Sequence, residues 1–252
     1  MTQIFNFPIN FNSPPKITFR GFSPQTIIPL GQPAQTDDFR ATNPLSGGVS
    51  AEQIEATAKS NPRIKEISQK YNIPIKANIE ELNKLNKGHL LQTRIVAANI
   101  YSNLPADLKR EVNLSDVQKA AMYHDYGKVL IPDSVLNKPD KLNLQEQEIM
   151  QQHSELGYEL LKNKGLNEHT LDLIKYHHQT NDGQGYPEIN NGYIVDIDLD
   201  ILRAADEYTA LREERSYKPA MSHEEALAVI KEQVDNGNMS QEVYDALSKI
   251  RV

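Results

Sequence analysis

The chain lacks cysteine altogether, although it is 252 residues long. A disulfide framework and a zinc site built on thiolates are therefore excluded, and any metal ion must be held by histidine, carboxylate or amide groups. No run of 18 apolar residues occurs, so the sequence predicts no transmembrane helix. The opening residues lack the basic and then apolar stretches of a signal peptide. We therefore expect a cytoplasmic protein that does not bind membranes.

The chain also has fewer positive than negative charges, and its formal net charge is −7. A protein that binds nucleic-acid polymers without sequence preference needs a basic surface for the phosphates, so we expect no such partner. The negative charge does not exclude a small phosphorylated substrate that is held through metal ions.

Residues 1–50 differ in composition from the rest. Half of the 14 prolines lie at or before Pro44, all six phenylalanines precede residue 40, and all 11 tyrosines lie at or after Tyr71. Proline disfavours regular helix, so we predict a Pro/Phe-rich, largely non-helical N-terminal extension over residues 1–50. Two interpretations stay open. The segment is a disordered tail, or its phenylalanines dock on the helical body or on a protein partner.

Helical signals dominate from Ser50 onward. Ser50 is a candidate N-cap, Pro62 suits the first position of a helix, and Ser222 with Glu225 forms a capping-box pattern. The predicted helices cover residues 50–59, 62–71, 78–86, 88–103, 115–125, 143–163, 167–178, 198–212 and 222–234, with a last one from residue 240. Two-residue alternation is nearly absent, which predicts an all-α fold. We expect short helices over 51–87 that lead into a main domain over 88–252.

Histidines and aspartates recur at the ends of apolar helical stretches. His124 and Asp125 follow an alanine-rich helix just before Gly127, and His177–His178 have the same placement. Adjacent residues within a helix point about 100° apart, so both members of a pair reach one metal cluster more easily at a helix end. Asp206 lies beside two alanines on a core-facing stretch, where a carboxylate needs a partner.

These residues sit within a longer series of motifs, which together match the pattern of a known family. The matching blocks are His-Asp-Tyr-Gly-Lys at 124–128, Ile-Pro-Asp-Ser at 131–134, His153, His177–His178, Asp-Gly-Gln-Gly-Tyr-Pro at 182–187, Asp206, and Arg-Ser-Tyr at 215–217. The region from about residue 88 to 250 resembles the HD-GYP family, a branch of the HD superfamily that hydrolyses cyclic di-GMP. The resemblance implies an HD-domain helical bundle with a metal cluster. It also implies six ligands, with Asp125 bridging two ions: His124, Asp125, His153, His177, His178 and Asp206.

The pattern breaks at one position. Members of the family supply a further histidine from an upstream helix, and the corresponding residue here is Gln92. An amide oxygen is a weaker donor than imidazole for a transition metal. His89 lies one turn earlier on the same helix face and is an alternative ligand. Three outcomes stay open: ligation by His89, ligation by Gln92, or loss of this ligand and of one ion.

We therefore expect a metal-dependent phosphodiesterase that hydrolyses a cyclic dinucleotide, with cyclic di-GMP as the first candidate. Two divalent ions, iron or manganese before zinc or nickel, would generate a hydroxide that attacks phosphorus. Asp125 and Lys128 are the expected catalytic residues. The expected substrate contacts are Lys128, Asp182, Gly185, Tyr186, Pro187 and Arg215. Two other hypotheses remain: a degenerate module that binds nucleotide or proteins without turnover, and a hydrolase of another nucleotide.

Overall fold

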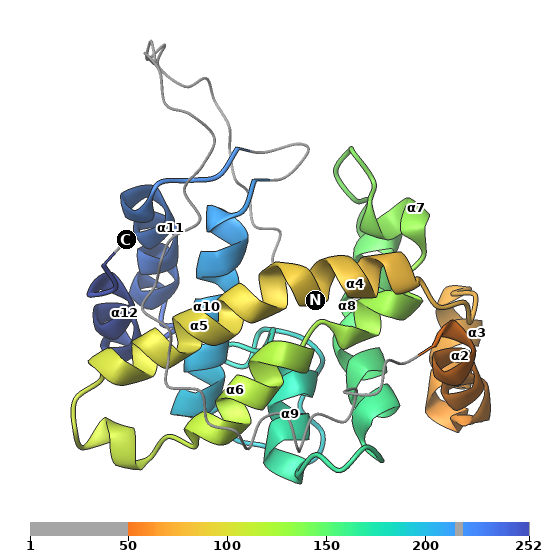
Figure 1. Cartoon of the computed structure of the whole chain (residues 1–252), viewed down its shortest axis with the longest axis horizontal. Helices are drawn as coiled ribbons and strands as arrows, with labels where there is room; N and C mark the ends of the chain where they lie inside the picture. Colours follow the sequence, from red (N-terminus) through yellow and green to blue (C-terminus); the bar gives the residue numbers. More distant parts are fainter. Residues whose placement is uncertain (1–49, 215–218, 252) are drawn as a thin grey trace.

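A computed structural model describes residues 50–214 and 219–251 (Figure 1). The helices of eight or more residues are α2 (Ala51–Ser60), α3 (Pro62–Tyr71), α4 (Ile79–Lys87), α5 (His89–Asn103), α6 (Leu114–Tyr123), α8 (Leu144–Leu161), α9 (Glu168–Tyr176), α10 (Ile197–Arg212), α11 (His223–Asp235) and α12 (Gln241–Ser248). Shorter helical turns are η1 (Leu108–Arg110), η2 (Tyr126–Leu130) and α7 (Asp133–Leu136). The described ranges contain no strand, which confirms the predicted all-α class. Of the predicted extension over residues 1–50, residues 1–49 lie outside the described residues.

The helix starts follow from their caps. The side chain of Ser50 accepts a hydrogen bond from the backbone of Gln53, and Asn143 and Ser222 open α8 and α11 with complete capping boxes. Asn61 caps α3 directly before Pro62. Because these side chains satisfy backbone N–H groups that a helix leaves unpaired, they fix where each helix begins.

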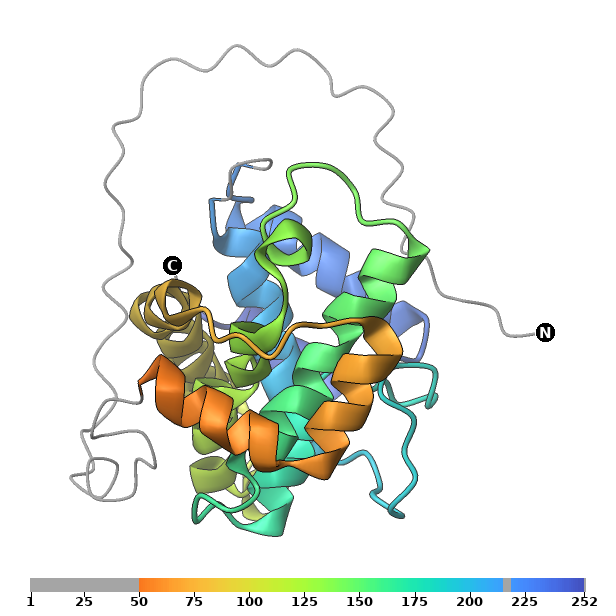
Figure 2. The ribbon, with the colours of Figure 1, turned by 90° about the vertical axis from the view of Figure 1, so that its right-hand side faces the viewer.

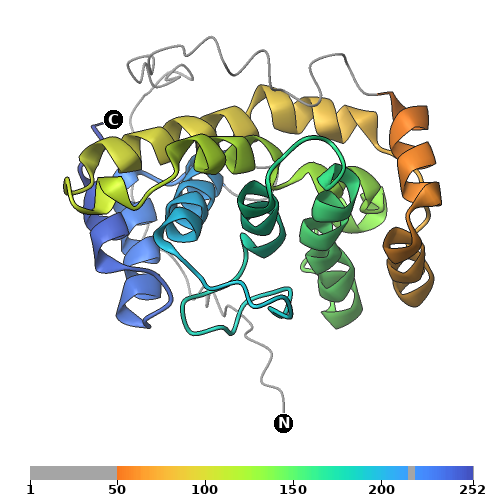
Figure 3. The same cartoon turned by 90° about the horizontal axis from the view of Figure 1, so that it is seen from below.

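The helices form two crossing sets. α8, α9 and α10 lie in a row, and α4, α5 and α6 run across them (Figures 1 and 3). α11 and α12 lie at one end of this row, and α2 and α3 lie at the other. The first residues of α5, the last residues of α6 and α9, and the middle of α8 and α10 therefore converge on the centre of the molecule.

Small residues let these helices approach one another. Ala97 on α5, Ala120 and Ala121 on α6, and Ala204 and Ala205 on α10 are all fully buried. Alanine side chains leave room for the neighbouring backbone, so polar groups at the helix ends are held close together inside a well-packed core.

α2 and α3 lie against α8 (Figure 2). The Asn61 amide donates to Glu159 Oε2 over 2.7 Å, and Arg63 Nε donates to Glu155 Oε1 over 2.8 Å. Both carboxylates lie on α8, which ties the first two described helices to the body.

No helix in the described part of the chain is long and apolar enough to cross a membrane.

Gly127 allows a close contact between η2 and α8. A Cβ atom at this residue would lie 1.9 Å from the carbonyl oxygen of His153 and 2.5 Å from the backbone nitrogen of Gly157. Only glycine fits such a contact without moving one backbone away from the other. This contact places the His124–Asp125 pair directly opposite His153.

Candidate metal centre

Three histidines at the centre share one local device. Each directs Nδ1 at the backbone carbonyl three residues earlier: His124 at Ala121 over 3.1 Å, His153 at Met150 over 2.7 Å, and His177 at Ile174 over 2.7 Å. A carbonyl only accepts, so the Nδ1 atom must carry the proton in each ring. The lone pair of each neutral ring is therefore on Nε2, which is the atom that faces the centre.

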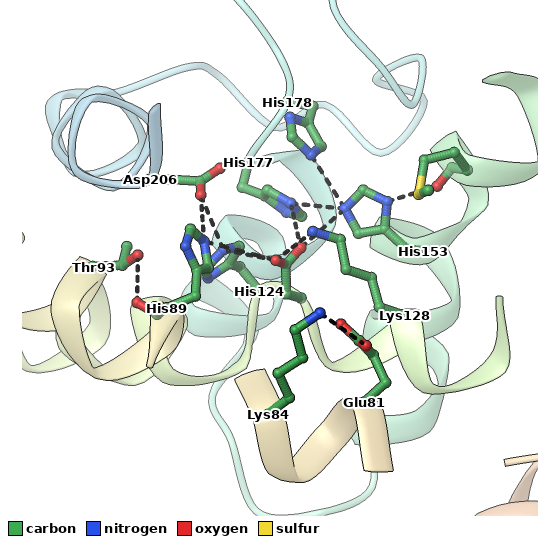
Figure 4. A network of polar contacts seen from close by, with 12 residues as sticks. Glu81, Lys84, His89, Thr93, His124, Lys128, His153, His177, His178 and Asp206 are labelled. Atoms are coloured by element: carbon green, nitrogen blue, oxygen red, sulfur yellow. Dashed lines mark hydrogen bonds and ion pairs between the residues drawn. The ribbon is translucent and has the colours of Figure 1, made fainter. Parts of the chain in front are cut away.

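The first group of donor atoms comes from α8 and from the end of α9. His153 Nε2 lies 3.1 Å from His177 Nε2 and 3.2 Å from His178 Nε2, and Asp125 Oδ1 lies 3.4 Å from His153 Nε2 (Figure 4). Donor atoms bound about 2.1 Å from one ion, at tetrahedral or octahedral angles, lie about 3.0–3.4 Å apart. The spacing therefore suits a single divalent ion.

Burial keeps these imidazoles neutral. Desolvation lowers the pKa of His153 to about 4, and the pKa values of His177 and His178 lie well below the ordinary value for the same reason. Neutral imidazole is the form that binds a metal ion, so these rings are ready to coordinate at neutral pH.

The second group contains His89, His124 and Asp206, whose donor atoms lie within 4.8 Å of one another. His124 Nε2 lies 3.5 Å from Asp206 Oδ1 and 3.6 Å from Asp125 Oδ2. This Nε2 atom is buried and has no hydrogen-bond partner among the described residues. A buried acceptor without a partner is unfavourable, and a bound cation would satisfy it.

Asp125 joins the two groups. Its Oδ1 atom faces His153, and its Oδ2 atom faces His124 and accepts a 2.6 Å hydrogen bond from Lys128 Nζ. Burial favours the neutral acid, but the positive charge of Lys128 opposes burial, and the pKa of Asp125 lies well below its usual range. The carboxylate is therefore charged and placed as a bridge, while Lys128 balances part of its charge.

His89, and not Gln92, lies within the described cluster. His89 is buried at the first position of α5, and its Nε2 atom lies 2.8 Å from Asp206 Oδ1. Gln92 is one turn later and remains partly exposed. Burial lowers the pKa of His89, but hydrogen bonds to Asp206 and Glu213 outweigh it and raise this pKa to about 10. An ion at this position would therefore replace the proton on Nε2.

The Gly-Tyr-Pro loop packs directly behind the histidines. A Cβ atom on Gly185 would lie 2.1 Å from the carbonyl oxygen of His178, so glycine is required for this approach. The Tyr186 ring stacks on the His178 ring with a centroid distance of 4.6 Å. Gln179 is buried, and its amide donates to the Pro187 carbonyl over 2.7 Å. The loop thus supports the His178 side chain, in addition to any contact with substrate.

The remaining expected substrate contacts are Asp182 and Arg215. Asp182 is exposed in the same loop, where its carboxylate accepts hydrogen bonds from the Thr180 hydroxyl and the Gln184 backbone. Arg215 lies outside the described residues.

Sequence reasoning missed Glu213, whose carboxylate contacts His89, and the three carbonyl groups that orient the histidine rings. A weak signal was available for the carbonyls, because His124 and His177 occupy helix C-caps, where the ring reaches back toward the preceding turn. No local signal marks Glu213, which meets His89 across 124 residues of sequence.

The described donor set consists of five histidines and two aspartates, which are residue types that commonly bind divalent metal ions. An HD domain family model matches residues 72–243. The chain belongs to the HD domain family. Together with the relatives below, this match confirms the HD-GYP membership that the sequence motifs indicate. Enzymes of the HD family depend on divalent metal ions, in agreement with the donor set.

Two curated relatives each match somewhat less than half of this chain. The cyclic di-GMP phosphodiesterase response regulator RpfG of Xanthomonas campestris pv. campestris is 39% identical over 117 residues, which are 45% of this chain and 31% of the relative. The 3'3'-cGAMP-specific phosphodiesterase 2 of Vibrio cholerae is 40% identical over 111 residues, which are 43% of this chain and 21% of the relative. The matched region thus spans less than a third of either relative.

A solved structure shows the same fold. Bd1817, a HDG"Y"P protein from Bdellovibrio bacteriovorus, superposes with a TM-score of 0.51 and 16% sequence identity, covering 82% of this chain and 64% of that chain. At this identity the likeness concerns the HD domain fold alone.

Proposed function

We propose that this HD domain is a metal-dependent phosphodiesterase that hydrolyses a cyclic dinucleotide, with cyclic di-GMP as its substrate. The observation that carries the proposal is the position of Asp125, whose two carboxylate oxygens face two separate groups of histidine and carboxylate donors. One group is His153, His177 and His178, and the other is His89, His124 and Asp206. A pair of ions joined by one carboxylate is the arrangement that phosphodiester hydrolysis uses in many hydrolases.

When bound, two divalent ions would lower the pKa of a water molecule and offset negative charge on the phosphate; iron and manganese suit these all-nitrogen and oxygen donors, with zinc or nickel as alternatives. The protein contributes fixed geometry. The carbonyl groups of Ala121, Met150 and Ile174 hold three rings in the required orientation before any ligand arrives. Such preorganisation means that little structural change is needed at the moment of reaction.

Lys128 has a defined place in this proposal. Its Nζ atom lies 2.6 Å from Asp125 Oδ2, at the edge of the cluster, and its side chain keeps 23% of its exposure. An ion bound to Oδ2 would compete for that oxygen and direct the ammonium group toward the adjacent phosphate. Lys128 would then neutralise charge on the substrate as well as on Asp125.

The substrate class rests on the relatives and on the loop. The names of RpfG and of the Vibrio cholerae relative refer to cyclic di-GMP and 3'3'-cGAMP, which are both cyclic dinucleotides. The Tyr186 ring stacks on His178 and, with Pro187, borders a pocket that is lined by Arg63 and Lys70 and by none of the donor histidines. This ring and the backbone of the loop would contact a guanine base. Asp182, from the same loop, and Arg215, which lies outside the described residues, are further proposed contacts.

The test is hydrolysis by defined variants. Asp125→Asn and His177→Gln should each abolish conversion of cyclic di-GMP to a linear product, measured by chromatography in the presence of manganese or iron. His223→Gln is the matched control, because this histidine bonds to Tyr208 and lies outside the donor groups. Retained turnover in both cluster variants would contradict the proposal. Binding without turnover in the wild-type protein would instead indicate a nucleotide-binding module.

A further inference from the structure

Both ring nitrogens of His89 form hydrogen bonds with carboxylates of α10 and its C-cap. Its Nε2 atom lies 2.8 Å from Asp206 Oδ1, and its Nδ1 atom lies 3.1 Å from Glu213 Oε1. Asp206 and Glu213 are two turns apart on the same face of α10, with Glu213 at its C-cap. The ring of His89 is therefore placed between two fixed points of α10.

This arrangement differs from that of the neighbouring histidines. His124, His153 and His177 direct Nδ1 at a carbonyl three residues earlier, within or at the end of their own helix. His89 begins α5, directly after Gly88, so no earlier turn of α5 exists to provide that carbonyl. Glu213 takes the place of the carbonyl and accepts a hydrogen bond from the Nδ1–H group.

We propose that Glu213 is a positioning residue that holds His89 with Nε2 turned toward Asp125 and Asp206, so that His89 supplies the ligand that Gln92 does not. The proposal rests on the function proposed above, because it assigns a role to Glu213 within the same metal centre. A carboxylate behind a ligating histidine fixes the ring orientation and makes the ring a stronger donor.

The effect should fall on one ion only. His89 Nε2 lies 3.8 Å from Asp125 Oδ2, on the side of the cluster that contains Asp206. The other group draws on His153, His177 and His178, which lie on α8 and at the end of α9. Loss of such a carboxylate elsewhere weakens metal binding about 10–100-fold, and we expect that range here for the ion next to Asp206.

The experiment compares Glu213→Ala with Glu214→Ala in the full chain. Both changes remove one negative charge at adjacent positions, but Glu214 is exposed and lies one residue beyond the cap of α10. The probe is manganese alone, titrated into metal-stripped protein and counted at equilibrium. We expect Glu213→Ala to weaken one of two binding steps about 10–100-fold and to leave the other unchanged. Glu214→Ala should match the wild-type protein, and Glu213→Gln, which keeps an acceptor oxygen, should lie between them.

A second readout does not depend on the metal. The ring nitrogens of His89 give 15N NMR signals that are assigned by their loss in His89→Gln. Glu213→Ala should shift these signals in the metal-free protein, whereas Glu214→Ala should not. Two unchanged binding steps in Glu213→Ala, or unchanged His89 signals, would overturn the role of Glu213. If Glu213→Ala loses one of two binding steps but the wild-type protein shows no turnover, only the proposed hydrolysis is overturned.

Discussion

The Nε2 atoms of His153 and His177 face each other over 3.1 Å, although the Nδ1 atom of each ring is already directed at a backbone carbonyl. With the proton of each neutral ring on Nδ1, neither Nε2 atom has a proton to share. Two lone pairs at this separation repel each other unless a cation lies between them. The two atoms are therefore better explained as two ligands of one metal ion than as the partners of a hydrogen bond.

Metal ions should accordingly stabilise the fold. We expect manganese at about 100 times its dissociation constant to raise the free energy of unfolding of metal-stripped protein by about 3 kcal/mol per site. His153→Gln should lose most of the gain at one site, because it removes a donor from the group of His153, His177 and His178. His223→Gln should keep it. Thermal unfolding with and without manganese measures the stabilisation of both variants. Equal stabilisation of His153→Gln and His223→Gln by manganese would contradict metal binding by His153.

The start of α5 provides a second prediction. His89→Ala should lower the number of tightly bound ions per chain from two to one, because its Nε2 atom lies against Asp206. Gln92→Ala should leave the number unchanged, since Gln92 is partly exposed one turn away. Elemental analysis of the two purified variants decides between them. The opposite pattern would mean that Gln92 is the ligand.

Gly127 should be intolerant of a side chain. Gly127→Ala places a Cβ atom 1.9 Å from the His153 carbonyl oxygen, and the separation of η2 from α8 that this demands should cost about 3 kcal/mol. Gly88→Ala is the control, because its nearest contact would be an ordinary 3.8 Å and only the cap of α5 changes, at about 1 kcal/mol or less. Urea unfolding of both variants measures the difference, and equal losses would refute the close contact.

His169 should make stability depend on pH. Its Nε2 atom lies 2.9 Å from Asp198 Oδ2, and Asp196 lies 3.8 Å from Nδ1. Burial lowers the pKa of His169, but the hydrogen bond to Asp198 and the charges of Asp196, Asp198 and Asp116 outweigh burial and raise it. A raised pKa in the folded state stabilises the protein fully below about pH 6.5, and this stabilisation is lost as pH rises through the folded value.

The corresponding measurement compares the wild-type protein with His169→Asn. The wild-type protein should be more stable by about 0.5–1 kcal/mol at pH 5.5, a modest value because the pair is partly exposed. The advantage should shrink as the pH is raised above 6.5. An advantage that grows with pH would show that the histidine is not held in its charged form.

The sequence was sufficient for most of the fold because its helix signals are local. Ser50, Asn143 and Ser222 cap helices through side chains that lie within three residues of the groups they bind. The sequence also indicated candidate site residues, because histidines and aspartates recur at the ends of apolar helices, where packing alone does not require them.

Tertiary relationships were not legible in the same way. The choice between His89 and Gln92 depends on where α5 begins and on how α10 crosses it, and no spacing rule gives either. Gly185 is an expected substrate contact, and the sequence did not reveal its close approach to the backbone of His178. The short turns η2 and α7 also escaped prediction, because each is stabilised by packing against its neighbours and not by a strong cap.

The most direct test of the central claim is a count of metal ions per chain, made on protein purified without chelator and assayed for cyclic di-GMP hydrolysis in the same sample. The account predicts two ions per chain together with turnover. One ion or none, without turnover after manganese or iron is supplied, would contradict it.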